Sequence, residues 1–444
     1  MQIIKEINEK LFSKTGKKVA GNIGWLTIER GVRLGFGLVV GILVARYLGP
    51  SDYGKLNYVI TFALIIEAIS SLGLDNIIIK KIVALKDRQF EIVNTSLTLR
   101  LISSIILIPV GILLIHLLRD DYAINLLAYI ILSSVVFRSI DVTDYWFQSY
   151  INSKYVVYSK IISFTFYGFI RLLFIYLGST VISFGVAFLL EGIIRSLILG
   201  WFYVKKSGSL FGIRIDWKLS KLLLKESWPL LFSAITVMIY MKIDIVMLGS
   251  MSTDNEVGLY TAAVKLSELW YNIPVIITAT LFPLILKYRK ESTQLFNERM
   301  QMLYDIMFIS MLCVSIIIFF TTDQIISLLF GLEYLPASNM LAIHVWSTIF
   351  ITFSVIRGKW LIANNLEIYT AITQGLGAIT NVILNIILIP KWQGIGASIA
   401  TLISYFIATT VASCLFKNLR EEFKLQIRSY FPYIRIYKYL KHPK

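Results

Sequence analysis

The chain has 444 residues, of which 57% are hydrophobic and 16% are charged, and its mean hydropathy is +0.72. This composition excludes an ordinary soluble globular domain and indicates an integral membrane protein. We interpret the formal charge of +16 as an orientation signal and an attraction to anionic lipid, and not as nucleic-acid binding.

The N-terminal segment is polar and basic and has no small-residue cleavage site behind a short apolar core, so we expect a cytoplasmic lead-in rather than a cleaved signal peptide. The apolar runs that follow are long and continuous, which favours helices over a β-barrel and predicts an all-α fold. With roughly 20 apolar residues per span, twelve transmembrane helices are predicted. They lie at about 22–44, 54–74, 97–118, 122–140, 155–177, 181–203, 228–249, 258–286, 303–320, 340–362, 368–389 and 395–416.

The longest polar connection divides these spans into two sets of six. The predicted domains are an N-terminal six-helix bundle with its lead-in at 1–203, a cytoplasmic linker at 204–227, a C-terminal six-helix bundle at 228–416 and a basic cytoplasmic tail at 417–444. The tail mixes basic and aromatic residues, which is typical of a segment on the inner leaflet.

A short pattern links the two halves. Gly49 and Gly54, after the first span, correspond to Gly249 and Gly258, after the seventh. Both connections are on the same side of the membrane, so this match suggests a parallel pseudo-repeat.

The positions of Lys and Arg predict the orientation. With both termini in the cytoplasm, the external connections hold only Arg46, Arg119 and Lys391, whereas the cytoplasmic segments hold nearly all other Lys and Arg outside the spans.

The first span carries charges deep in the bilayer. Counted from Asn22, Arg33 lies about 16 Å into a hydrocarbon core of roughly 30 Å, where a lipid-facing charge costs at least about 2.5 kcal/mol. Arg30 shares a helix face with Arg33, and Glu29 is one turn from Arg33. Two interpretations stay open: a structural ion pair between Glu29 and Arg33, or the lining of a water-filled cavity.

Further charges within the spans favour the cavity. The spans hold the cations Lys55, Arg100, Arg138, Lys160, Arg171, Arg195, Lys242, Lys265, Arg357 and Lys359, and the acids Glu29, Glu67, Asp141, Glu191, Asp244 and Glu268. Because cations outnumber acids, a shared cavity would be positive and its substrate anionic. The planar fork of arginine favours phosphate or pyrophosphate over a simple halide.

Four stretches of the chain, 45–81, 242–285, 330–341 and 380–405, resemble the polysaccharide transporters of the multidrug/oligosaccharidyl-lipid/polysaccharide exporter superfamily. Lys80 and Lys81 stand where that family often has an arginine. The resemblance implies two bundles in a V around a central cavity, in a bacterial cytoplasmic membrane. It also implies a flippase that moves an undecaprenyl-pyrophosphate-linked repeat unit of O-antigen, capsule or similar glycan outward by alternating access. A polysaccharide polymerase and a chain-length regulator would be its protein partners.

On this interpretation the site residues have the following roles. Arg30, Arg33 and Lys242 would bind the pyrophosphate, and Arg138, Arg171 and Lys265 would extend the positive surface. Glu29 and Asp244 would couple an ion or pair with a charge. No cofactor, metal or catalytic residue is expected, since Cys313, Cys414, His116, His344 and His442 are scattered.

Two alternatives belong to other classes. A multidrug-type cation antiporter of the same superfamily would need acids and aromatic residues in its cavity. A membrane glycosyltransferase or polymerase would need a catalytic constellation on an external loop, where the only acidic cluster is the short segment 119–121.

Overall fold

The computed structural model describes residues 14–208, 212, 216–432 and 435. In these ranges all regular structure is helical, as the sequence predicts. Within the described residues, ten helical stretches are long and apolar enough to cross a membrane.

Two of the ten stretches each contain two predicted spans joined at a kink. Helix α2 (Lys14–Ser70) changes direction at Gly49, whose φ is 69° and ψ 170°, directly before Pro50. Helix α15 (Ile368–Phe406) changes direction at Gln393, three residues after Pro390. A proline inside a helix removes a backbone hydrogen bond and clashes with the preceding turn, which favours a kink. The ten stretches and their two kinks therefore account for the twelve predicted helices.

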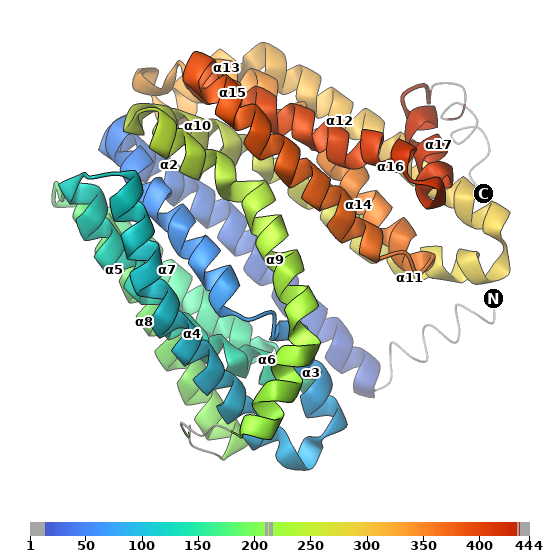
Figure 1. Cartoon of the computed structure of the whole chain (residues 1–444), viewed down its shortest axis with the longest axis horizontal. Coiled ribbons are helices and arrows are strands. Elements are labelled where there is room, and N and C mark those ends of the chain that lie inside the picture. Colours follow the sequence, from blue (N-terminus) through green and yellow to red (C-terminus); the bar gives the residue numbers. More distant parts are fainter. Residues whose placement is uncertain (1–13, 209–211, 213–215, 433–434, 436–444) are drawn as a thin grey trace. The chain divides into compact units, whose positions relative to one another are not determined.

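The chain forms two compact units. Unit 1 comprises Met1–Leu48 and Lys55–Ile235. Besides parts of α2 and α9, its elements are α3 (Asp75–Ala84), η1 (Lys86–Arg88), α4 (Gln89–Leu118), α5 (Tyr122–Arg138), η2 (Ser139–Asp141), α6 (Val142–Ser149), α7 (Lys154–Tyr176) and α8 (Val181–Ser207). Helix α8 packs along both α5 and α7 (Figure 1). Asp121 caps the N-terminus of α5 by accepting a hydrogen bond from the Ile124 amide at 2.9 Å.

Unit 2 comprises Gly49–Gly54 and Thr236–Lys444. Its elements are the end of α9 (Trp217–Met251), α10 (Asp254–Glu268), η3 (Leu269–Tyr271), α11 (Asn272–Glu291), α12 (Thr293–Phe330), η4 (Leu332–Tyr334), α13 (Ala337–His344), α14 (Ser347–Ala363), α15, a π-helical turn (Ile407–Val411), α16 (Ala412–Leu415), η6 (Lys417–Leu419) and α17 (Arg420–Ser429). Its core includes the buried aromatic residues Tyr304 on α12 and Phe353 and Trp360 on α14, packed with aliphatic residues of the same and neighbouring helices.

The borders of these units differ from the predicted domains. Much of the predicted linker is helical, because α8 continues to Ser207 and α9 begins at Trp217. The border between the units falls inside α9, after Ile235. Part of the predicted tail packs on unit 2, because α17 contacts α12 and buries Glu422.

Two of the glycines that the sequence comparison pairs, Gly54 and Gly258, lie in a close reciprocal contact within unit 2. A Cβ on Gly54 would lie 1.9 Å from the Asp254 carbonyl oxygen, and a Cβ on Gly258 would lie 1.9 Å from the Pro50 carbonyl oxygen. Only glycine allows the backbone to approach so closely.

Candidate functional site

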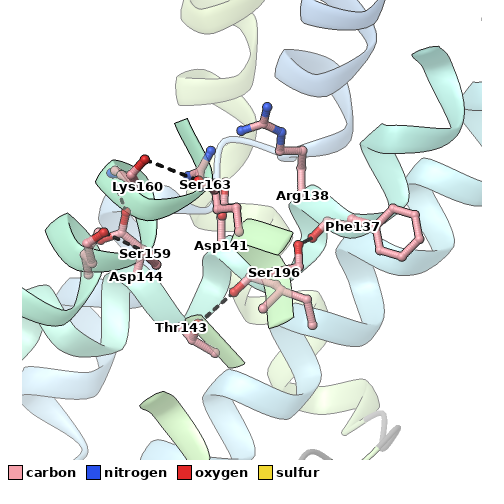
Figure 2. A network of polar contacts seen from close by, with 12 residues as sticks. Phe137, Arg138, Asp141, Thr143, Asp144, Ser159, Lys160, Ser163 and Ser196 are labelled. Carbon is pink, nitrogen blue, oxygen red and sulfur yellow. Dashed lines mark hydrogen bonds and ion pairs between the residues drawn. The ribbon is translucent and has the colours of Figure 1, made fainter. Parts of the chain in front are cut away.

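Three ion pairs lie in the interior of unit 1. Arg138 on α5 bonds Glu191 on α8 at 2.7 Å, Arg195 on α8 bonds Asp141 at 2.8 Å, and Lys160 on α7 bonds Asp144 at 2.9 Å. Figure 2 shows Asp141, Asp144 and Lys160 near one another, with Arg138 to one side of them.

These pairs change how Arg138 is interpreted. Its side chain is 14% exposed and that of Glu191 is 12% exposed, so each charge depends on the other for compensation. Three span cations of unit 1, Arg138, Lys160 and Arg195, therefore already have a carboxylate partner, and Arg138 holds helices α5 and α8 together.

Arg33 and Glu29 form the ion pair that one interpretation of the first span predicts. Arg33 Nε lies 3.2 Å from Glu29 Oε1, and the two side chains are 58% and 7% exposed. Glu29 Oε1 makes no hydrogen bond with good geometry, so the pair is loosely aligned. The exposed guanidinium of Arg33 is still open to an external anion. The side chain of Arg30 lies outside the described part of the chain.

Arg171 differs from the other predicted site cations. It is only 9% exposed, and its guanidinium lies over the ring of Tyr167, 4.9 Å from the centroid. Its Nε makes no hydrogen bond, and among the described residues no carboxylate lies within ion-pair distance of it. A buried cation without a counter-charge is costly, so Arg171 is a candidate for binding an external anion.

The two predicted lysines of unit 2 have partners on nearby elements. Lys242 Nζ lies 3.2 and 3.4 Å from the carboxylate oxygens of Glu268. Lys265 donates a hydrogen bond to the hydroxyl of Tyr53 at 3.3 Å. Lys242 is therefore paired across α9 and α10, and Asp244, two residues away, makes a separate set of contacts.

Asp244 is 4% exposed and receives hydrogen bonds from neutral groups. Asn385 Nδ2 donates at 2.6 Å, Thr401 Oγ1 at 2.6 Å and the Tyr260 hydroxyl at 2.9 Å. Asn381 supports this set through a 3.0 Å hydrogen bond from Asn385. The sequence analysis missed these partners, although Asn381 and Asn385 are one helical turn apart in an apolar span and would share a face.

Arg357 has a structural role that the sequence analysis did not foresee. It is 1% exposed and donates hydrogen bonds to the carbonyl oxygens of Ala408 and Thr409, at 2.7 and 2.9 Å, in the π-helical turn. A π-helical turn leaves backbone carbonyls without their usual helical donors. Arg357 compensates for this irregularity through its two hydrogen bonds to the turn.

Two all-helical units with charged and polar groups inside long apolar helices define a multi-pass membrane protein. Among solved structures, the chain is similar to the lipid II flippase MurJ in an inward closed conformation, with a TM-score of 0.71, 17% identity and coverage of 93% of this chain and 92% of that one. It is equally similar to an inward-facing multidrug transporter of the MATE family, with a TM-score of 0.70, 17% identity and coverage of 92% and 99%. Both belong to the twelve-helix, two-bundle fold that the sequence predicts.

The chain belongs to the family described as polysaccharide biosynthesis protein, whose model matches residues 19–289. It is 27% identical over 232 residues to the probable low-salt glycan biosynthesis flippase Agl15 of Haloferax volcanii, covering 50% of this chain and 48% of that relative. The uncharacterized membrane protein MJ1068 of Methanocaldococcus jannaschii is 25% identical over 429 residues, covering 88% and 82%. The family that the four sequence stretches resemble is thereby confirmed.

Proposed function

We propose that this protein is a flippase that moves an oligosaccharide linked to a polyprenyl pyrophosphate from the cytoplasmic to the outer leaflet by alternating access. Its family and its likeness to a probable glycan flippase support this proposal. In a bacterial membrane the carrier lipid would be undecaprenyl pyrophosphate and the product a surface polysaccharide such as O-antigen or capsule. A polymerase and a chain-length regulator would then act on the exported unit.

The observation that carries the proposal is the buried guanidinium of Arg171, which has no counter-ion among the described residues. A phosphate oxygen pair would supply the missing negative charge and match the two-pronged geometry of arginine. Because such a contact is charge-assisted and shielded from water, it would stabilise the bound lipid strongly.

The other predicted cations differ in how easily each could contact an anionic substrate. The guanidinium of Arg33 is largely exposed, so it could contact an anion while still paired with Glu29. Lys265 donates its hydrogen bond to the neutral hydroxyl of Tyr53, so it could contact an anion without leaving a carboxylate. Arg138 and Lys242 would first have to exchange Glu191 and Glu268 for the substrate. We therefore propose Arg171, Arg33 and Lys265 as direct contacts, each within its own unit, and Arg30 as a further one.

Asp244 is the proposed coupling group. A buried carboxylate held by neutral donors has no fixed cation to compensate its charge, so a proton or a small cation could bind there and be released. The side-chain oxygen of Asn385, which is buried and makes no hydrogen bond, would add a second acceptor. Glu29 is the weaker candidate because Arg33 already pairs with it.

The test measures binding of a fluorescent polyprenyl-pyrophosphate disaccharide to the purified protein. Loss of one charge-assisted contact costs about 1.5–3 kcal/mol, so Arg171→Gln should weaken binding about ten- to hundredfold. Arg171→Lys should recover only part of the affinity, because an ammonium lacks the planar fork. Arg195→Lys is the matched control, since it keeps the charge beside Asp141. Equal affinity of Arg171→Gln and the wild-type protein would exclude Arg171 as the anion contact.

The alternative function is export of organic cations, which the fold of the MATE transporter and the buried Asp244 favour. On this alternative, Asp244→Asn would abolish proton- or sodium-driven uptake of a lipophilic cation into vesicles, and the lipid-linked disaccharide would not bind.

A further inference from the structure

Three lysines and two aromatic rings gather where α7 begins and α8 ends. Lys154 Nζ and Lys206 Nζ lie 5.0 and 5.1 Å from the ring centroid of Tyr155, and Lys205 Nζ lies 4.8 Å from that of Trp201. Only residues 177–180 separate the two helices, which pack along each other, so the start of α7 meets the end of α8. We call these five residues the lysine–aromatic patch.

The patch is positively charged, and no neighbouring carboxylate balances that charge among the described residues. Lys154, Lys205 and Lys206 are exposed, and none of them has a carboxylate within ion-pair distance among the described residues. Elsewhere in unit 1 the situation differs: Lys81 pairs with Glu226 at 2.5 Å and Lys160 pairs with Asp144 at 2.9 Å. Lysines held near the same ring repel one another, so an anion placed between them would be strongly favoured.

The surroundings of the patch are those of a membrane interface. The Trp201 side chain is 57% exposed, and Leu197, one turn earlier on α8, is 67% exposed. Exposed tryptophan is typical of the headgroup level of a bilayer, and the apolar surface beyond it would face acyl chains. The count of Lys and Arg predicts that this end of unit 1 is cytoplasmic, where the anionic lipids concentrate.

We propose that the lysine–aromatic patch binds the phosphodiester headgroup of an anionic phospholipid in the cytoplasmic leaflet. The three ammonium groups would contact the phosphate, and the rings of Tyr155 and Trp201 would hold the lysines in place through cation–π contacts. The neighbouring apolar surface of α8 favours a lipid over a free anion. This lipid would be a resident of the membrane, distinct from any transported substrate.

Each lysine near an anionic surface contributes about fivefold to the binding constant, so three contribute about a hundredfold. The experiment counts phosphatidylglycerol molecules retained by the full-length protein in native mass spectrometry, with phosphatidylcholine as the neutral competitor. The triple variant Lys154→Gln, Lys205→Gln and Lys206→Gln should lose the preference for phosphatidylglycerol.

A matched control removes the same charge elsewhere in unit 1. Lys218, Lys221 and Lys225 on α9 are exposed and, among the described residues, lie over no aromatic ring, so replacing all three by Gln should leave the retained phosphatidylglycerol almost unchanged. Trp201→Leu keeps the apolar surface but removes the ring under Lys205, and it should weaken retention less than the triple variant does. It also serves as the informative variant if the triple variant does not fold.

Two results would overturn the proposal. One is equal loss of phosphatidylglycerol from the patch variant and the α9 control, which would mean that only total charge matters. The other is displacement of the lipid by millimolar inorganic phosphate, which would make the patch a site for free anions.

Discussion

The ion pair between Arg138 and Glu191 allows a quantitative test of the interior of unit 1. Their closest atoms are 2.7 Å apart, and the side chains are 14% and 12% exposed, so either charge alone would be left buried without its partner. Breaking a buried pair on one side costs about 3–5 kcal/mol, whereas replacing both partners by apolar residues is often neutral. We therefore expect Arg138→Leu and Glu191→Leu each to destabilise the protein strongly and the double variant to be closer to the wild type.

In domains of 150–250 residues, 1 kcal/mol corresponds to about 2–4 °C in Tm, and a cost of about 3 kcal/mol therefore lowers the Tm of unit 1 by about 6 °C or more. The assay follows tryptophan fluorescence of the purified variants during heating, with the protein in one detergent throughout. Because two independent costs of about 3 kcal/mol each would add, a double variant closer to the wild type requires a coupling energy of at least about 3 kcal/mol between the two substitutions. Additive destabilisation, with no recovery in the double variant, would refute the pairing and return Arg138 to the set of free cations.

Three further predictions test other parts of the molecule. Gly258→Ala would bring a methyl group to 1.9 Å from the Pro50 carbonyl oxygen, so it should lower the yield of folded protein and cost about 1–3 kcal/mol or more; unchanged stability would mean that the contact is loose. In a cysteine-free background, Asn255→Cys should react with an impermeant maleimide on intact cells and Ser207→Cys should not; the reverse would invert the orientation. Burial raises the pKa of Glu422 above its ordinary value of 4.5, so its contribution to stability is present below pH 4.5 and is lost as the pH rises through the raised pKa. Glu422→Gln should flatten that part of a stability–pH curve, and an unaltered curve would exclude Glu422 as its cause.

Much of the fold follows from the sequence because a bilayer constrains each span separately. Length and hydropathy alone predict the twelve helices, and the sequence match between the two halves pairs Gly54 with Gly258, which the structure brings into reciprocal contact. The kink at Gln393 could also have been predicted from the sequence, because Pro390 lies three residues before it in an apolar run. The helices and the kink depend on residues that are close together in the chain, so a single sequence is enough to predict them.

The partners of the buried charges could not be predicted in the same way. Arg138 and Glu191 are separated by 53 residues, and Asp244 and Thr401 by 157. Which of many charges meet depends on the rotation and register of packed helices, and hydropathy contains no information about either. A count of charges therefore overestimates how many cations can bind an external anion, and the structure singles out Arg171 because it shows which cations already have a carboxylate partner.

The most direct test of the account is translocation of a lipid-linked oligosaccharide by the purified protein in vesicles. A fluorescent polyprenyl-pyrophosphate disaccharide is placed in both leaflets, and a membrane-impermeant reductant then quenches the molecules that reach the outer leaflet. The account predicts that the wild-type protein exposes the lipid of the inner leaflet to the reductant and that Arg171→Gln stays at the level of protein-free vesicles. Failure of the wild-type protein to move the lipid, in vesicles that accumulate a lipophilic cation in exchange for protons or sodium, would contradict it and favour the multidrug alternative.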